Sequence, residues 1–96
     1  MATLYKVGQV SRETMTFVVG GVNTDPTTVT CKVKNPNGVS TTYTWAGGTV
    51  TRSAQGVFYR DITLTISGEW FVRFEGDAPA QDADEKSILV ENSEFD

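Results

Sequence analysis

Hydrophobic and polar residues alternate most regularly within residues 56–74. Apolar positions in the first half are Phe58, Ile62, Leu64 and Ile66, and those in the second half are Trp70, Val72 and Phe74. A period of two is typical of strands that place one face on a core. Because glycine accepts the positive φ that tight hairpin loops need, Ser67-Gly68 predicts a turn between two long antiparallel strands. We expect this hairpin to form the centre of the core.

Shorter alternating segments occupy much of the remaining chain. The clearest is residues 27–34, where Val29, Cys31 and Val33 alternate with polar side chains. Further strands are predicted at residues 5–12, 14–19, 39–45, 49–52 and 87–91, with 49–52 at a sheet edge and 75–85 as a polar loop. Seven or eight short strands separated by turn signals predict an all-β, antiparallel sandwich or barrel.

The length of 96 residues predicts a single domain, with a core at residues 5–91 and a short acidic tail at 92–96. No apolar run approaches the ~20 residues that span a bilayer, and the first residues lack the layout of a secretory signal. We therefore expect synthesis in a cytoplasm and no membrane partner. Cys31 is the single cysteine, so an internal disulfide is excluded and a buried, unreactive thiol is expected.

Charge is distributed unevenly along the chain. Residues 1–74 carry a balance of +3 and residues 75–96 a balance of −7, which together give the net charge of −4. Nucleic acid is disfavoured as a partner, because phosphate binding needs clustered Lys and Arg. The acidic segment is interpreted first as a solvated tail and, alternatively, as a source of head-to-tail attraction between copies.

Candidate catalytic chemistry is sparse. The chain has no histidine, which removes Ser-His-Asp and Cys-His catalysis, and one cysteine alone does not build a zinc site. We therefore expect no enzymatic activity and no cofactor. Asp77, Asp82, Asp84 and Glu85 offer oxygen ligands for Ca²⁺, but they lack the spacing of an EF-hand, and a solvated loop is the favoured interpretation.

A protein interface is the favoured type of site. Tyr59 and Phe71 fall on the face of the predicted hairpin opposite Phe58 and Trp70, so they are expected to form an exposed apolar patch. Arg60 or Arg73 would lie nearby, and aromatic residues and arginine are enriched at interfaces. A sugar-binding platform of aromatic rings is the alternative, although alternation places Trp70 in the core.

Several motifs resemble those of an immunoglobulin-like sandwich across residues 5–91. They are Asp25-Pro26 before a strand, Asn35-Pro36-Asn37-Gly38 after it, Gly56-x-Phe58 and Gly68-x-Trp70. Two features differ from antibody-type domains, because the chain has one cysteine and Phe58 replaces the tyrosine of the usual corner. The resemblance implies an immunoglobulin-like sandwich without a disulfide.

A narrower resemblance concerns residues 59–76, followed by Ile88-Leu89-Val90 and Ser93-Glu94-Phe95. This pattern is similar to small proteins encoded among the virion genes of tailed bacteriophages. It implies a structural or accessory protein of the virion, made in the host cytoplasm, that docks on capsid or tail proteins or on other copies of itself. A module that binds host-surface glycans or mediates adhesion is the alternative, since sandwich folds host many functions.

Overall fold

The computed structural model describes residues 3–92, which form ten strands and no helix, and therefore no helix that could cross a membrane. The strands are β1 (Thr3–Lys6), β2 (Val10–Thr16), β3 (Val18–Val19), β4 (Val22–Asn23), β5 (Val29–Lys34), β6 (Ser40–Thr44), β7 (Thr51–Ala54), β8 (Val57–Thr63), β9 (Gly68–Gly76) and β10 (Asp82–Glu91).

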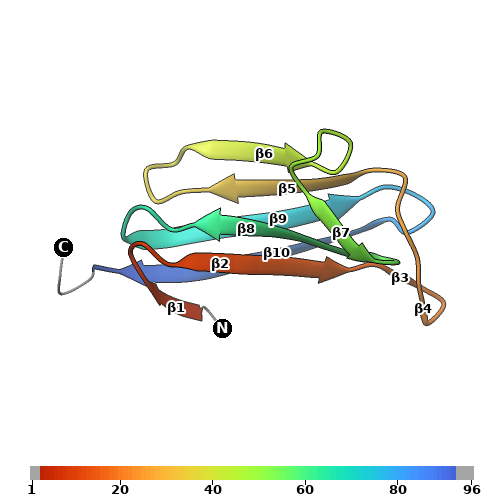
Figure 1. Ribbon diagram of the computed structural model, residues 1–96, viewed down its shortest axis with the longest axis horizontal. Coiled ribbons are helices and arrows are strands. Elements are labelled where there is room, and N and C mark those ends of the chain that lie inside the picture. The colour runs from red at the N-terminus through yellow and green to blue at the C-terminus, as the bar shows by residue number, and fades with distance from the viewer. Residues whose placement is uncertain (1–2, 93–96) are drawn as a thin grey trace.

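Two sheets of unequal size pack face to face (Figure 1). One has five strands in the order β1-β10-β9-β5-β6, and the other has three in the order β2-β8-β7. Strands β3 and β4 form a separate small hairpin at one end. All paired neighbours are antiparallel except β1 and β10, which run parallel. The all-β sandwich predicted from the sequence is confirmed.

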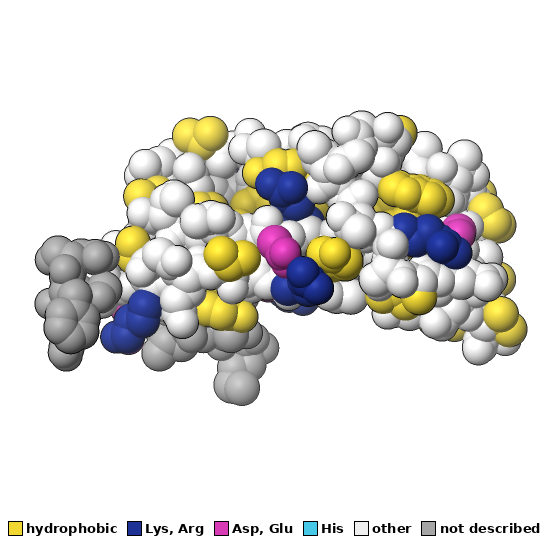
Figure 2. Space-filling model, viewed as in Figure 1, with side chains coloured by type: hydrophobic (Ala, Val, Ile, Leu, Met, Phe, Trp, Pro, Cys, Tyr) yellow, Lys and Arg dark blue, Asp and Glu magenta, His cyan; other side chains and the backbone are white. Residues whose placement is uncertain are grey.

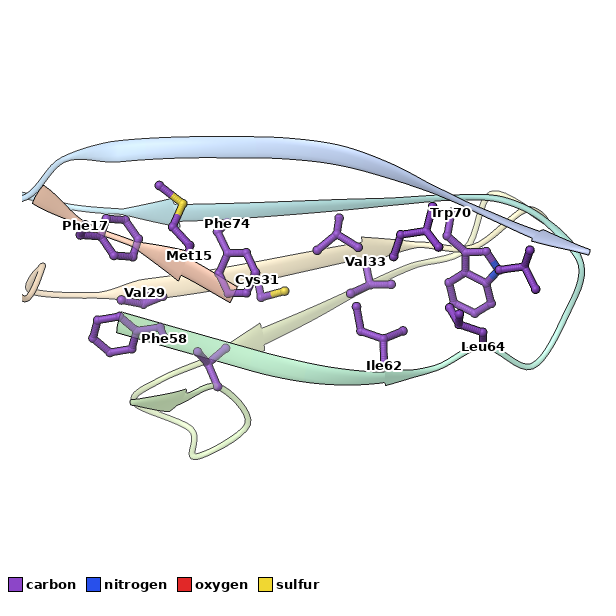
Figure 3. Packing of buried hydrophobic residues seen from close by; sticks show 14 of the residues in the cluster. Met15, Phe17, Val29, Cys31, Val33, Phe58, Ile62, Leu64, Trp70 and Phe74 are labelled. Carbon is purple, nitrogen blue, oxygen red and sulfur yellow. The ribbon is translucent and has the colours of Figure 1, made fainter. Parts of the chain in front are cut away.

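Alternating side chains fill the space between the sheets (Figure 3). Phe58, Ile62 and Leu64 lie between β8 and the five-stranded sheet. The Phe17 and Phe58 rings meet edge to face with centroids 5.8 Å apart. Such aromatic pairs add stability beyond the area that they bury. The core is therefore shared by both sheets.

Two predicted core residues are confirmed as buried. Cys31 is fully buried on β5, and its burial raises the pKa of the thiol to about 12, which keeps it protonated and unreactive. Trp70 is 5% exposed, and its indole N–H donates a hydrogen bond of 3.0 Å to the Ile66 carbonyl. A buried Trp70 does not offer a ring face to a sugar.

The predicted hairpin of residues 56–74 is wrong. β8 pairs with β2 and β7, whereas β9 pairs with β5 and β10, so the two strands belong to different sheets. The connection at residues 64–67 crosses from one sheet to the other, with Leu64 fully buried at its start. Strands that face each other across a core show the same alternation as strands that pair, so the pattern does not distinguish the two arrangements.

Two further boundaries differ from the prediction. The segment 5–12 is divided, because the chain leaves the five-stranded sheet after Lys6 and enters the three-stranded sheet at Val10. Gly8, with φ of +96°, allows this crossing. The expected loop 75–85 is shorter, because β9 runs to Gly76 and β10 begins at Asp82. Backbone pairing with β9 orders the polar start of β10.

An ion pair joins the two sheets where β2 faces β10. Glu13 points inward from β2 and is 5% exposed, and its carboxylate lies 3.0 Å from the Lys86 ammonium. The Ser11 hydroxyl also donates a hydrogen bond to Glu13. A buried carboxylate needs such partners, because leaving one unpaired costs about 3 kcal/mol.

Replacing Phe58 with Ala is expected to lower the free energy of unfolding by about 3–5 kcal/mol, because a fully buried ring leaves a cavity. Phe71→Ala, which truncates a ring that is 40% exposed, is expected to cost less than ~1 kcal/mol. Urea denaturation of both variants provides the comparison. Equal losses would contradict the burial of Phe58 in the core.

Replacing Lys86 with Met is expected to lower the free energy of unfolding by roughly 2–3 kcal/mol, because it leaves the Glu13 carboxylate buried without its cation. The double variant Glu13→Leu/Lys86→Met removes both charges and is expected to recover most of that loss. Urea denaturation of the single and double variants measures the difference. A double variant no more stable than Lys86→Met would show that the ion pair does not join the sheets as described.

Candidate functional site

The four predicted interface residues do not form one patch. Tyr59 and Arg60 lie on β8 in the three-stranded sheet, whereas Phe71 and Arg73 lie on β9 in the five-stranded sheet. The shared patch was expected because residues 56–74 were predicted to form one hairpin. That expectation is wrong because β8 and β9 belong to different sheets. Tyr59 and Phe71 instead face outward on opposite sides of the sandwich and therefore belong to two separate surfaces.

The outer face of the three-stranded sheet carries a small polar cluster around Tyr59. The Arg12 guanidinium lies 4.0 Å from the centre of the Tyr59 ring and forms two hydrogen bonds with Asp61, of 2.8 and 3.0 Å. The hydrogen bond with Arg12 lowers the pKa of Asp61 and raises that of Arg12. In Figure 2, where this sheet faces the viewer, hydrophobic atoms form separate areas between charged side chains. The described part of this face therefore shows no continuous apolar patch.

The outer face of the five-stranded sheet presents Phe71, with 40% of its surface exposed. In the sheet it lies opposite Ser87 on β10 and Lys34 on β5. A shallow depression of about 360 Å³ lies beside the ring, lined also by Lys32, Ser40, Arg73 and Glu85. Phe71 and Arg73 are of residue types that are enriched at protein interfaces, and the charged groups around them resemble a polar rim.

The charges around Phe71 form a connected network. Glu75 lies 3.1 Å from the Lys32 ammonium and accepts a hydrogen bond of 2.8 Å from Arg73, whose guanidinium is also 3.5 Å from Glu85. The hydrogen bond from Arg73, followed by that from Lys32, lowers the pKa of Glu75. Lys34 makes no ion pair with any residue within 3–92. The network fixes Arg73, while Lys34 stays available to a partner.

Arg60 occupies a groove between the sheets that sequence reasoning missed. Its guanidinium lies 4.0 Å from the centre of the Tyr43 ring, and its NH1 donates a hydrogen bond of 3.3 Å to the Thr49 carbonyl. The Arg60 Nε is buried without an acceptor among the described residues. The signal was present in the sequence, because Arg60 shares the inward parity of Phe58 and Ile62.

This groove is a cavity of about 270 Å³ between β6 and β8, with Val33, Tyr43, Arg60, Ile62 and Trp70 among its lining residues. It opens where the five-stranded sheet extends beyond the three-stranded sheet. Strand β7 pairs with β8 only as far as Tyr59, so residues 60–63 have no strand partner on that side within the described chain. The groove therefore combines a positive charge, two aromatic rings and unpaired strand edges.

The acidic residues that offer oxygen ligands for Ca²⁺ are not arranged around a common point. Asp82, Asp84 and Glu85 belong to β10, where neighbouring side chains point to opposite faces, and Glu85 lies beside Arg73. Asp77 instead accepts a hydrogen bond of 2.7 Å from the Thr28 hydroxyl. Among residues 3–92 no group of three or more metal-ligating side chains is gathered together.

Comparisons with known proteins give no relative. No family model matches the chain, and no curated protein or solved structure shows a significant match to it.

The Glu75 network predicts a pH dependence of stability. The pKa of Glu75 is lower in the folded protein than the ordinary value of 4.5. The stability that the ionised Glu75 contributes is therefore present above pH 4.5, and it is lost as the pH falls through the pKa of the folded state. Because these groups are exposed to solvent, the contribution is expected to stay below about 1 kcal/mol. Glu75→Gln is expected to lose less stability than the parent protein between pH 5 and pH 3, measured by urea denaturation.

The matched control for this prediction is Glu69→Gln, on the same strand but outside the ion-pair network. We expect its stability to change with pH as in the parent protein. A Glu75→Gln variant with an unchanged pH profile would contradict the network's contribution.

Proposed function

We propose that this protein is a non-enzymatic structural or accessory protein of a tailed bacteriophage particle. It docks on capsid or tail proteins through the outer face of its five-stranded sheet. The observation that carries the docking role is Phe71, a large aromatic side chain that is 40% exposed on a rigid sheet and framed by charged groups. Rigid aromatic anchors with a polar surround dominate the binding energy of many protein interfaces.

The virion part of the proposal extends the resemblance that the pattern of residues 59–76, 88–90 and 93–95 suggested in the sequence, and no matched relative adds to it. The strand order supports the immunoglobulin-like arrangement that this similarity implies. A sheet with β10, β9, β5 and β6 side by side faces a sheet of β2, β8 and β7, in the manner of sandwiches with antiparallel sheets. Fold alone does not select a function, so the docking role depends on the Phe71 surface.

A glycan-binding role has less support from the aromatic side chains. Trp70 is buried, and Trp45 packs edge to face against Phe58 with ring centroids 4.7 Å apart. Arginine side chains lie over the rings of Tyr43 and Tyr59. Within the described chain, these four rings therefore do not form an open platform on which a sugar stacks, and protein docking is the function that we favour.

The non-enzymatic part of the proposal is supported by the state of the carboxylate at the groove. Asp61 lines the groove, but its carboxylate is engaged by Arg12, which lowers its pKa. A general base is most effective when its pKa lies near the working pH. A paired surface carboxylate with a lowered pKa is poorly suited to proton transfer near neutrality.

Quantitative mass spectrometry of purified particles from the phage that encodes the protein tests the proposal. We expect the protein in the particle, at a copy number that matches the shell protein for capsid decoration or the tail components for tail attachment. Absence from the particle would overturn the virion role.

Particles assembled with Phe71→Ala test the docking surface. Loss of a central anchor is expected to reduce incorporation by about tenfold or more, as for interface hot spots. Val10→Ala is the matched control, because Val10 is 57% exposed but lies on β2 in the other sheet. Equal incorporation of both variants would place the docking surface elsewhere.

A further inference from the structure

Strand β6 is an unprotected edge of the five-stranded sheet. Proteins commonly block edge strands with charges, proline, bulges or very short strands, because unpaired backbone groups recruit other chains. The other edges carry such features: β2 has the inward Glu13, β7 has an irregularity between Arg52 and Ala54, and β1 has four residues. The β6 sequence Ser-Thr-Thr-Tyr-Thr has no charge and no proline, and its pairing with β5 is regular.

The backbone groups available on β6 follow from its pairing with β5. Hydrogen bonds of 3.0 Å join Asn35 N–H to the Val39 carbonyl and Trp45 N–H to the Val29 carbonyl. Antiparallel pairs alternate between bonded and non-bonded, so Ser40 and Thr42 direct their N–H and C=O groups away from β5. The Thr44 carbonyl already accepts hydrogen bonds from the N–H groups of Thr49 and Val50, so Thr44 is not part of the free edge. The free edge is therefore centred on Ser40 and Thr42.

Positive charges flank this edge on both faces of the sheet. Arg60 lies on the inner side, over the Tyr43 ring, with a buried Nε that has no acceptor among the described residues. On the outer side, Lys32 and Lys34 project from β5 at the positions opposite Thr42 and Ser40. A strand added to β6 places alternate side chains on the two faces. Lys32 already pairs with Glu75, so Lys34 on the outer face and Arg60 on the inner face are the cations that acidic side chains of an added strand would meet.

We propose that the β6 edge binds residues 93–96 of a second copy of this chain as an added strand. This segment reads Ser-Glu-Phe-Asp, which combines two carboxylates with one aromatic ring. In an added strand, Glu94 and Asp96 would point to one face of the sheet and Phe95 to the other. The carboxylates would then pair with a cation beside β6, and the ring would pack on the opposite face. The cavity beside Tyr43 and the depression beside Phe71 border these two faces.

The same segment of its own chain is too short for this role. The chain leaves β10 after Glu91 at the end of the sandwich where Gly68 lies against Pro36, and three strand spacings of ~4.8 Å separate β10 from β6. The five residues after Glu91 span at most about 18 Å, whereas a strand added to β6 lies four spacings, roughly 19 Å, from β10, so the segment does not reach along the free edge of its own chain. Association in trans uses two different surfaces of each copy, so it continues head to tail.

Pairing of β6 with β6 of a second copy is disfavoured by charge. It would bring Lys34 and Arg60 of both copies to one seam, and the β6 strands supply no carboxylate. The acidic segment supplies the opposite charge. Association through the β6 edge needs no virion component, so purified protein alone is sufficient for the test.

Sedimentation velocity of the full chain, from micromolar to about millimolar concentration, tests the inference. We expect association that increases with protein concentration and weakens as salt screens the ion pairs. The double variant Glu94→Gln/Asp96→Asn is expected to weaken association about tenfold or more, because it removes charge-assisted hydrogen bonds. The control Asp82→Asn/Asp84→Asn removes the same charge from β10 and is expected to associate as the parent does.

The variant Thr42→Pro removes an edge N–H that β5 does not use, and it is expected to abolish association without unfolding the sheet. Mixing it with Glu94→Gln/Asp96→Asn provides the decisive measurement. One variant keeps the acidic segment and the other keeps the edge, so the mixture is expected to form a dimer that neither forms alone. Because misfolded variants would not complement each other, a dimer in the mixture supports the proposal.

Three results would overturn the inference. They are a monomer at every concentration, association that Thr42→Pro leaves unchanged, and association that needs Thr42 but is unaffected by Glu94→Gln/Asp96→Asn. The last result would identify another occupant of the β6 edge, such as β6 of a second copy.

Discussion

The structure depends on covering the apolar face of a five-stranded sheet with only three strands. An amphipathic sheet is stable in water only when a second layer removes that face from solvent. Phe58, Ile62 and Leu64 contribute to this cover from β8 and its continuation, and Met15 contributes from β2. Because three strands do not reach across five, one flank is left without a strand above it, and the groove beside Tyr43 and Arg60 lies there. The inequality of the sheets thus determines both the core and the exposed edges.

The two flanks of the sandwich are closed by different interactions. Where β2 faces β10, the Glu13–Lys86 pair joins the sheets from within, and each charge is neutralised by the other. At the opposite flank, Arg60 lies over an aromatic ring and donates to one carbonyl, and it forms no ion pair within residues 3–92. A cation over an aromatic ring is stabilised without losing its capacity for further hydrogen bonds. The molecule therefore has one flank where the charges pair with each other and one flank where Arg60 can still bind an acceptor.

Alternation in the sequence predicted which residues face the core, and it did so well for β5, where Val29, Cys31 and Val33 are buried. It did not predict which strands pair, because facing and neighbouring strands around one core share the same pattern. The polar start of β10 was missed for a related reason, since backbone pairing to β9 orders residues whose side chains give no apolar signal. The inward Arg60 was visible as an interruption of the pattern between Phe58 and Ile62, but its partner Tyr43 comes from a distant strand.

The parallel pairing of β1 with β10 has a mechanical consequence. Residues Thr3 to Lys6 align with Ile88 to Glu91, so the chain enters β1 at one end of this pair and leaves β10 at the other. Force applied between the segment before β1 and the segment after β10 pulls the two strands along their length in opposite directions. Hydrogen bonds loaded in this way share the load and break together, whereas bonds at a fraying end break one after another. A protein exposed to mechanical stress would thus be held by its first and last strands.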